Sequence, residues 1–570
     1  MAAGSAASAD LADLAGLAGY DLAVLGAGPA GLAAAVTAAR AGARVALIDA
    51  GDRVGGQYWR HREADDGAGH HHWQTLVRLR DSLPQLDFLA RHTVWHVART
   101  GSAPADGGGP TEGTGGGIAV PAGGGGSAER TGGGIAAPAG GGGSAEGAGG
   151  RTVASAGGGG SSKGTGGRTV ASADGGRPAK ETGGGFTTRT SRRGFGGDSG
   201  GGFTVHTNRG EVRARTLVVA TGAYDRQLPF PGWTLPGVFT AGGAQALLKG
   251  HGVRAGSRVV VAGTGPFLLP VAAGLARAGA EVAGVFEAGS PAGFARSPLA
   301  VLGSPGKLAE GVGYLKTLAR KRIPYRTRTA VVAAHGDDSV RSVTVASLDR
   351  GWRIVAGSER EIACDTVAVG YGFTPQLEIP LQLGCETRLG ADGSLIAVAD
   401  EQQRATVPGV YLAGEVCGVG GAELSLVEGE LAGLHAAFTT VGAEPDSSVV
   451  TVLLRRRKSA RAFAGAMHAA HPVRPGWLDW LDAPTLLCRC EEVTVGTVRD
   501  TIADLGATDA RTVKLLARPG MGLCQGRVCG YATACLTAAG QGREPTAADL
   551  AGLAARPIAQ PVRLGDLASG

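Results

Sequence analysis

Four cysteines near the C-terminus have the spacing of metal ligands. Cys488 and Cys490 form one close pair and Cys524 and Cys529 form another, so half of the chain's eight cysteines fall within one short segment. Thiolates brought together from two such loops bind either a zinc ion or a two-iron cluster. A Cys-x-Cys pair is tight for structural zinc, whereas the backbone amides of neighbouring glycines suit the sulfides of a cluster. The pattern therefore favours a [2Fe-2S] cluster, with a zinc ion and unligated thiols as the alternatives.

The N-terminal segment has the pattern of a dinucleotide-binding unit. An apolar run over residues 20–25 leads into a glycine-rich turn and an alanine-rich stretch, and a second apolar run ends at Asp49. This order predicts strand, tight turn, helix and strand. Gly26 permits the turn, Gly28 lets the backbone approach a pyrophosphate, and Gly31 lets the helix pack closely on the strand. Asp49 is placed to accept hydrogen bonds from a ribose.

Three later segments favour a flavin in this unit. One follows Asp49 directly, and the other two each end a buried apolar strand with a turn of small residues. Such turns are landmarks of flavoproteins and would lie near the ribityl chain and the ring. They are Gly56-Gln57, Thr221-Gly222 and Gly414-Glu415.

At residues 55–60, 223–237, 420–429 and 520–529 the chain resembles a family of FAD oxidoreductases with two dinucleotide domains. More narrowly, it resembles the larger flavin subunit of multi-subunit amine, opine, proline or hydroxyproline dehydrogenases and of hydrogen cyanide synthase. The resemblance implies an α/β fold with two interleaved Rossmann-like domains, as in glutathione reductase. It also implies a small helical [2Fe-2S] domain like bacterioferritin-associated ferredoxin.

The same resemblance assigns two sets of site residues. At two positions this chain departs from the pattern of the family: Glu415 stands where the family usually has Asp, and Asp49 stands where Glu is commoner. The implied cluster ligands are Cys488, Cys490, Cys524 and Cys529, and the implied FAD residues are Gly26, Gly28, Pro29, Ala30, Gly31, Asp49, Gly56, Gln57, Val94, Thr221, Gly222, Gly414 and Glu415.

A second strand-turn-helix unit begins near residue 258. Gly263 and Gly265 repeat the first two glycines of the motif, but Leu268 occupies the third position and obstructs close packing. Glu287 is placed to accept a ribose 2′-hydroxyl and would favour NAD over NADP. Two interpretations stay open, an NAD(P) site and a purely architectural domain.

The expected domains follow these motifs and the composition. They are a discontinuous FAD-binding domain (20–98, 203–254 and 350–440), a glycine-rich low-complexity insert (99–202), a second dinucleotide-binding-like domain (255–349), a linker (441–483), a [2Fe-2S]-binding domain (484–545) and a C-terminal tail (546–570). The insert has too few large apolar residues for a core. The alternating segments 93–97 and 203–207 flank it, so we expect them to pair as a hairpin with the insert as its loop.

The composition of the chain excludes several classes of protein. The chain has 570 residues, 43% of them hydrophobic, and no apolar run long enough to span a bilayer. A net charge of +6 without a basic, aromatic-rich run gives no support for nucleic-acid binding. The first twenty residues lack a signal-peptide pattern, which favours the cytoplasm. Cys364, Cys385, Cys417 and Cys535 are isolated among small or apolar neighbours, so we expect buried thiols without a redox role.

The expected function is electron transfer between the flavin and the cluster of an oxidoreductase subunit. In the resembled complexes a partner flavin subunit oxidises the amine or imino acid, so we expect a hetero-oligomer that could include a small ferredoxin-like subunit. The alternatives are a self-contained NAD(P)H-dependent reductase and a non-catalytic scaffold. No catalytic acid or base is identified, because Tyr224, Glu423 and Glu428 have structural roles at least as plausible. The basic run 455–458 is interpreted as a solvated linker or a docking surface.

Overall fold

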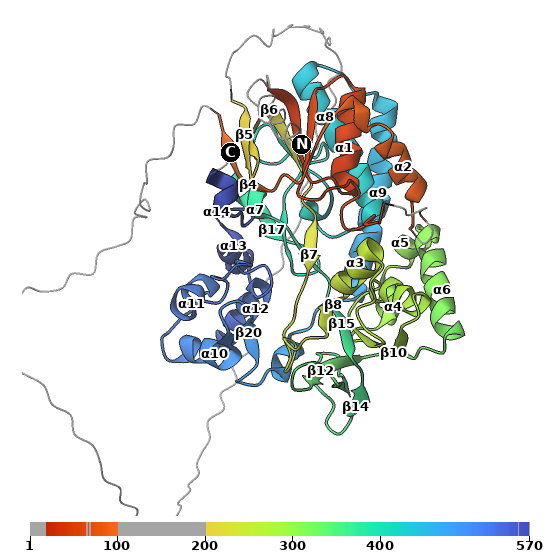
Figure 1. Ribbon diagram of the computed structural model, residues 1–570, viewed down its shortest axis with the longest axis vertical. Helices are drawn as coiled ribbons and strands as arrows, with labels where there is room; N and C mark the ends of the chain where they lie inside the picture. The colour runs from red at the N-terminus through yellow and green to blue at the C-terminus, as the bar shows by residue number, and fades with distance from the viewer. Residues whose placement is uncertain (1–18, 64–66, 68–69, 101–200, 557, 569–570) are drawn as a thin grey trace, which may run out of the picture. The chain divides into compact units, whose positions relative to one another are not determined.

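A computed structural model describes residues 19–63, 67, 70–100, 201–556 and 558–568 (Figure 1). The glycine-rich insert therefore lies, apart from its two ends, outside the described residues. The remaining described segments belong to one compact unit. None of its described helices is both long enough and apolar enough to cross a membrane.

The first domain is built on a seven-stranded sheet in the order β3-β2-β1-β6-β5-β4, with β19 paired to β6. Strand β1 is buried and pairs in parallel with β2 and β6, as its continuous apolar run predicts. Helix α8 packs on α1 through Gly429 and Gly433, where any side chain would meet the α1 backbone. The elements are β1 (Tyr20–Leu25), α1 (Pro29–Arg40), β2 (Val45–Asp49), α2 (Trp73–Arg80), η2 (Leu83–Gln85), β3 (Asp87–Ala90), β4 (Val94–Arg99), β5 (Phe203–Thr207), β6 (Gly210–Val219), β19 (Val410–Leu412), η4 (Gly414–Cys417) and α8 (Ala422–Val441).

The second domain has a five-stranded sheet in the order β11-β10-β9-β15-β8. Because β15 pairs in parallel with both β9 and β8, this sheet extends beyond the expected boundaries 255–349 into segments assigned to the FAD domain. The elements are β8 (Val238–Thr240), α3 (Ala241–His251), β9 (Arg258–Gly263), α4 (Leu268–Arg277), β10 (Glu281–Glu287), η3 (Pro291–Arg296), α5 (Pro298–Leu302), α6 (Pro305–Arg320), β11 (Tyr325–Thr327), the three-stranded sheet β12 (Thr329–His335), β13 (Ser342–Ser347) and β14 (Arg360–Ala363), and β15 (Thr366–Gly370).

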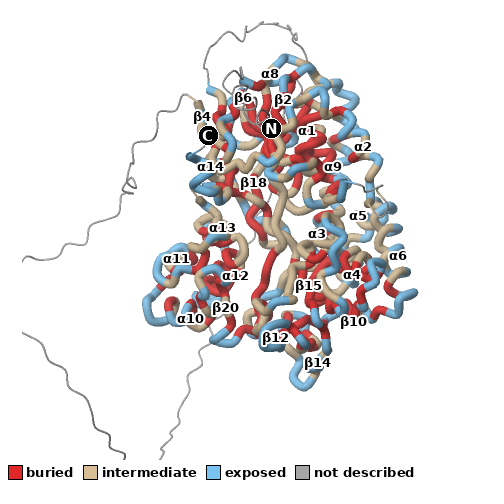
Figure 2. The backbone as a smooth tube through the Cα atoms, in the orientation of Figure 1, coloured by how far each residue is buried: buried red, intermediate tan, exposed pale blue. Residues whose placement is uncertain are grey.

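Two antiparallel strands carry the chain between the two domains. β7 (Ala223–Asp225) begins directly after the Thr221-Gly222 turn and pairs with β16 (Phe373–Pro375), on which the chain returns. α7 (Glu378–Gln382) and the pair β17 (Thr387–Leu389) and β18 (Leu395–Ala397) follow. Buried residues, red in Figure 2, follow the central strands and α1. The expected fold of two interleaved dinucleotide domains is confirmed.

The C-terminal part begins with a long helix. α9 (Ser447–Ala470) lies in the segment expected as a linker and packs along α8 and η3. The helices of the cysteine-bearing domain continue past residue 545, because α13 packs on α11 and α12 and Thr546 caps it in a capping box with Asp549. The elements are η5 (Pro475–Trp480), β20 (Leu486–Cys488), β21 (Val493–Thr494), α10 (Val495–Ala503), α11 (Ala510–Ala517), α12 (Gly530–Gly540), α13 (Ala547–Ala554) and α14 (Leu564–Ala568).

The expected hairpin around the insert is confirmed. β4 and β5 pair antiparallel from Val94–Thr207 to Arg99–Phe203. Beyond the strands, the amide of Thr100 donates to the carbonyl oxygen of Gly202 at 2.8 Å, and the amide of Gly202 donates to Thr100 Oγ1 at 2.6 Å. The two ends of the insert are therefore held together at Thr100 and Gly202.

Deleting residues 104–199 should leave the FAD content and the thermal midpoint nearly unchanged. The closed hairpin keeps its register, and the entropy of loop closure changes by only about 0.6 kcal/mol for each doubling of loop length. Flavin absorbance per chain and a thermal melt of the deletion variant beside the full chain measure the effect. Loss of flavin or of cooperative unfolding would contradict this prediction.

Candidate flavin and iron-sulfur sites

The glycine turn after β1 has the geometry that a dinucleotide phosphate needs. Gly26 has φ +102°, which favours glycine, and a Cβ on Gly31 would overlap the carbonyl oxygen of Gly26. Gly28 is the N-cap residue of α1, and a Cβ added there would meet no atom within 4 Å. The space beside Gly28 at the N-terminus of α1 is thus open, which suits a pyrophosphate.

Asp49 lies at the end of β2 beside this turn. Its Oδ2 accepts from the amide of Ala27 at 2.6 Å and its Oδ1 from the amide of Gly51 at 2.7 Å. The residue is only half-buried, so the carboxylate retains lone pairs for the ribose hydroxyls of an adenosine. His92 donates its amide to the Asp49 carbonyl oxygen at 2.9 Å, which brings the start of β4, with Val94, toward the same end of the site.

The other residues expected at the flavin gather around the turn. A Cβ on Gly56 would come within 2.8 Å of Gly28 Cα, and one on Gly414 within 2.9 Å of Ala30 Cβ. Gly222 has φ +84° and open space beside it. Thr221 donates its hydroxyl to the Gln376 carbonyl oxygen at 3.0 Å, and Gln57 is exposed. Glycine at these positions leaves the backbone accessible to a bound cofactor, so the residues fit FAD.

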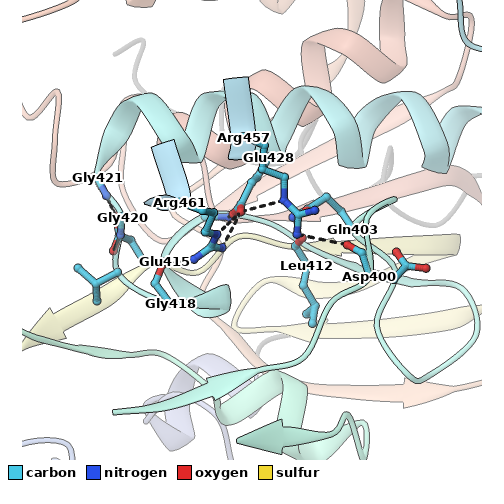
Figure 3. Close-up of polar contacts among 12 residues, drawn as sticks. Asp400, Gln403, Leu412, Glu415, Gly418, Gly420, Gly421, Glu428, Arg457 and Arg461 are labelled. Carbon is cyan, nitrogen blue, oxygen red and sulfur yellow. Dashed lines mark hydrogen bonds and ion pairs between the residues drawn. The ribbon is translucent and has the colours of Figure 1, made fainter. Parts of the chain in front are cut away.

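Glu415 is oriented toward the N-terminus of α8. Its two carboxylate oxygens accept from the amides of Gly421 at 2.9 Å and Gly420 at 3.3 Å (Figure 3). Burial raises the pKa of Glu415 to about 7, although both amides and Arg461 act in the opposite direction. The side chain of Glu415, one methylene longer than the Asp usual in the resembled family, is thus accommodated by the N-terminus of α8.

Glu428 and α9 support the loop that carries Gly414. Glu428 is fully buried, and its Oε2 accepts from the amide of Gly414 at 3.1 Å. Arg461 donates to Glu428 Oε1 at 2.9 Å through Nε, and Arg457 donates to the same oxygen at 3.4 Å (Figure 3). Glu428 is therefore structural, and Arg457, in the run interpreted as a solvated linker or a docking surface, forms a half-buried ion pair. The sequence offered one signal for this ion pair: Arg457 and Arg461 are four residues apart, which places them on the same face of a helix.

The four cysteines meet as two pairs. Each thiol interacts with a thiol of the other loop, Cys488 with Cys529 and Cys490 with Cys524. The interaction with Cys529 is the largest of the effects that lower the pKa of Cys488, which falls to about 5. The amide of Gly520, 3.4 Å from the Sγ of Cys488, also lowers it. Burial of Cys490 raises its pKa. Among the described residues no three His, Cys, Asp or Glu side chains converge as the ligands of one metal ion. Four thiols arranged as two pairs match a [2Fe-2S] cluster, which takes four cysteine ligands, two on each iron.

Glycines allow the cysteine loops to approach each other. Gly520 and Gly526 both have φ +81°, and a Cβ on Gly520 would lie 3.2 Å from Gly526 Cα and 3.8 Å from Cys529 Sγ. A Cβ on Gly522 would overlap Cys490 Cβ. Cys488 and Cys529 are buried while Cys490 is exposed, so one pair faces the domain interior and the other pair lies nearer the surface. The four isolated cysteines (Cys364, Cys385, Cys417 and Cys535) are buried, as expected.

Comparison with protein families agrees with both sites. A model of the pyridine nucleotide-disulphide oxidoreductases matches residues 20–440. The chain belongs to this oxidoreductase family. A model of the BFD-like [2Fe-2S] binding domain matches residues 486–536. This pyridine nucleotide-disulphide oxidoreductase is thus an FAD-dependent enzyme with a [2Fe-2S] domain.

Individual relatives agree with this assignment. Hydrogen cyanide synthase subunit HcnB from Pseudomonas aeruginosa is 36% identical over 324 residues, which cover 56% of this chain and 70% of that protein. The A subunit of opine oxidase from Agrobacterium tumefaciens is 30% identical over 564 residues, covering 96% and 91%. The crystal structure of L-proline dehydrogenase from P. horikoshii has the same fold, with a TM-score of 0.57 at 19% identity, over 96% of this chain and 79% of that one.

The second dinucleotide unit of this oxidoreductase differs from the first at the ribose end. Glu287 accepts from the amides of Gly265 and Gly289 at 2.9 and 2.8 Å, as Asp49 does at its own turn. Glu287, however, is completely buried, and His471 at the end of α9 covers it with Nδ1 3.4 Å from Oε1. Gly263, with φ +140°, packs against the Gly370 backbone, and a Cβ on Gly265 would meet no atom within 4 Å. The phosphate turn is therefore open, whereas the carboxylate expected at the ribose is covered.

Proposed function

We propose that this chain relays reducing equivalents between an FAD in the first dinucleotide unit and a [2Fe-2S] cluster held by Cys488, Cys490, Cys524 and Cys529. The observation that carries this proposal is a contact between the cysteine loop and the strand that follows the turn assigned to the flavin. Arg527, inside the loop from Cys524 to Cys529, donates through Nε to the hydroxyl of Tyr224 at 2.8 Å. Tyr224 lies in β7, two residues after Gly222 of the turn assigned to the flavin.

The residues of the chain bind, orient and enclose the two groups. Gly26, Gly28 and Gly31 shape the phosphate turn, Asp49 would accept from the ribose of the FAD, and Glu415 is oriented by the amides at the N-terminus of α8. FAD, when bound, supplies two-electron chemistry that a cluster with two irons complements with single-electron transfer. Thiol chemistry has no support, since each described cysteine outside the two pairs is buried.

The relatives indicate the setting in which the chain works. Hydrogen cyanide synthase HcnB and the opine oxidase relative are both subunits of larger enzymes by name. We infer that this chain works in a hetero-oligomer, and that a partner flavin subunit oxidises an amine, opine or imino acid such as proline or hydroxyproline. A small ferredoxin-like subunit is a further candidate partner. Within this chain Glu423 is exposed and Glu428 is held by arginines, so neither is proposed as a catalytic acid or base.

The alternative, a self-contained NAD(P)H-dependent reductase, needs an accessible second nucleotide site. The covered carboxylate of Glu287 argues against it, because the ribose hydroxyls of a dinucleotide would have to displace His471 and the end of α9. The packing there is close, since a Cβ on Gly293 of η3 would come within 2.5 Å of Ala470 Cα. We therefore propose an architectural role for the second unit.

Anaerobic addition of NADH to the purified chain tests this choice. We expect the flavin absorbance to stay unchanged, whereas dithionite, the positive control, should bleach it and develop the paramagnetic signal of the reduced cluster. The chain is then coexpressed with the proteins encoded by the neighbouring reading frames, and the purified complex is tested with a panel of amines. This should identify a substrate that bleaches the flavin. Rapid bleaching by NADH without any partner would contradict the relay proposal and support the reductase.

A further inference from the structure

Two arginines connect the second cysteine loop to the flavin domain. Arg527 donates through Nη1 to the carbonyl oxygen of Cys524 at 3.2 Å, and Arg556, which follows α13, donates through Nε to the carbonyl oxygen of Gln525 at 2.6 Å. Both guanidinium groups thus bind the backbone of the loop between Cys524 and Cys529. Their side chains are only 10% and 6% exposed, so solvent screens them little.

Glu378 of α7 receives both arginines on one oxygen. Arg527 Nε lies 2.9 Å and Arg556 Nη1 3.0 Å from Glu378 Oε1, and the Tyr224 hydroxyl donates to the same oxygen. Glu378 is 5% exposed on its side chain. A small cavity lined in part by Tyr224, Glu378, Arg527 and Arg556 lies at this junction.

The carboxylate is also joined to the flavin turn through the backbone. Gln376, two residues before Glu378, donates its amide to the Gly222 carbonyl oxygen at 3.0 Å. Its own carbonyl oxygen accepts from the Thr221 hydroxyl at 3.0 Å. Hydrogen bonds from the cysteine loop to Glu378, the backbone from Glu378 to Gln376, and hydrogen bonds from Gln376 therefore connect the loop to the Thr221-Gly222 turn.

The network carries an excess of positive charge. Two guanidinium groups face one carboxylate, and arginine keeps its charge in proteins. Burial, followed by the nearby Glu378 carboxylate, raises the pKa of Tyr224 above its ordinary value, so the phenol keeps its proton and stays neutral. One uncompensated positive charge therefore remains beside the cysteine loop.

We propose that Arg527, Arg556 and Glu378 are positioning residues that hold the cysteine loop on the flavin domain, and that the net positive charge of the three raises the reduction potential of the cluster. The proposal rests on the ligand assignment made above. A two-iron cluster with four thiolates is negative, and adding one electron, without making or breaking a bond in these side chains, increases that charge. A nearby positive charge in a poorly screened site stabilises the reduced form.

The test is an anaerobic redox titration of the full-length chain, monitored by the paramagnetic signal of the reduced cluster. Arg556→Gln should lower the equilibrium constant for reduction about tenfold, which is 59 mV for one electron. Glu378→Gln removes the opposing charge and should shift the potential upward. Arg556→Lys, which keeps the charge, should stay near wild type. Arg563→Gln is the matched control, because it removes an exposed charge from the same C-terminal segment.

Opposite shifts of the reduction potential in Arg556→Gln and Glu378→Gln indicate an effect of charge. A loss of packing would not change direction according to the sign of the charge that is removed. Equal potentials in all variants, or shifts of the same sign for Arg556→Gln and Glu378→Gln, would overturn the inference. If Arg556→Gln loses its cluster, the direction of the Glu378→Gln shift decides by itself. A wild-type chain without any cluster signal would instead refute the ligand assignment of the proposed function.

Discussion

Replacing Cys490 with alanine should abolish the iron content and the paramagnetic signal of the reduced protein while leaving FAD bound. Cys490 and Cys524 form the pair nearer the surface, and a [2Fe-2S] cluster needs four cysteine ligands. The flavin turn lies in another domain and makes none of its described contacts with Cys490, so flavin binding does not depend on it. Iron and acid-labile sulfide assays, together with the flavin absorbance of the same sample, measure both halves of the prediction.

Cys364→Ala is the matched control, because Cys364 is a buried cysteine of the second domain and is not one of the four expected ligands. It should keep the iron, the sulfide and the signal. Wild-type protein purified without oxygen that holds one zinc and no acid-labile sulfide would refute the cluster, and only the flavin half of the proposal would survive.

Replacing Gly28 with valine should remove FAD from a protein that still folds. No atom lies within 4 Å of a Cβ at Gly28, and its φ of −71° is accessible to any residue, so the apoprotein tolerates the change. The branched side chain instead occupies the space that the pyrophosphate needs at the N-terminus of α1. We expect the affinity for FAD to fall by at least about a hundredfold, roughly 2.7 kcal/mol.

Flavin absorbance after purification and a titration of the apoprotein with FAD measure the loss. Gly313→Val is the control, since a Cβ on this glycine of α6 also meets no atom within 4 Å and lies away from the flavin turn. A yellow Gly28→Val protein with one flavin per chain would contradict the site assignment. Gly31→Val would be uninformative, because the Cβ would overlap the Gly26 backbone and disturb the fold itself.

The features that the sequence predicted are those that depend on local spacing. The turn from Gly26 to Gly31 lies between one strand and one helix, so the spacing of its glycines sets its geometry directly. The pairing of β4 with β5 was predictable because both segments alternate apolar and polar residues, although the whole insert separates them. The two cysteine loops were apparent for the same reason, since each holds two cysteines at close spacing. Which thiols pair, Cys488 with Cys529 and Cys490 with Cys524, depends on how the two loops meet.

Contacts between distant segments needed the tertiary structure. The basic run in α9 was interpreted as a solvated linker or a docking surface, yet Arg457 and the nearby Arg461 pair with the buried Glu428. Glu287 has the spacing of a ribose-binding carboxylate, but His471, far along the chain, covers it. Burial of this kind depends on the path by which α9 returns to the second domain, which no local pattern encodes.

The sequence by itself thus determined the fold class, the phosphate turn of the first unit and the four expected cluster ligands, because glycine and cysteine spacing act through local backbone geometry. Tertiary structure decided which carboxylates are accessible and how the two sites are connected. Glu378, Arg527 and Arg556 are separated by up to 178 residues and meet only after the domains pack. Their charges interact through space at distances that sequence separation does not predict.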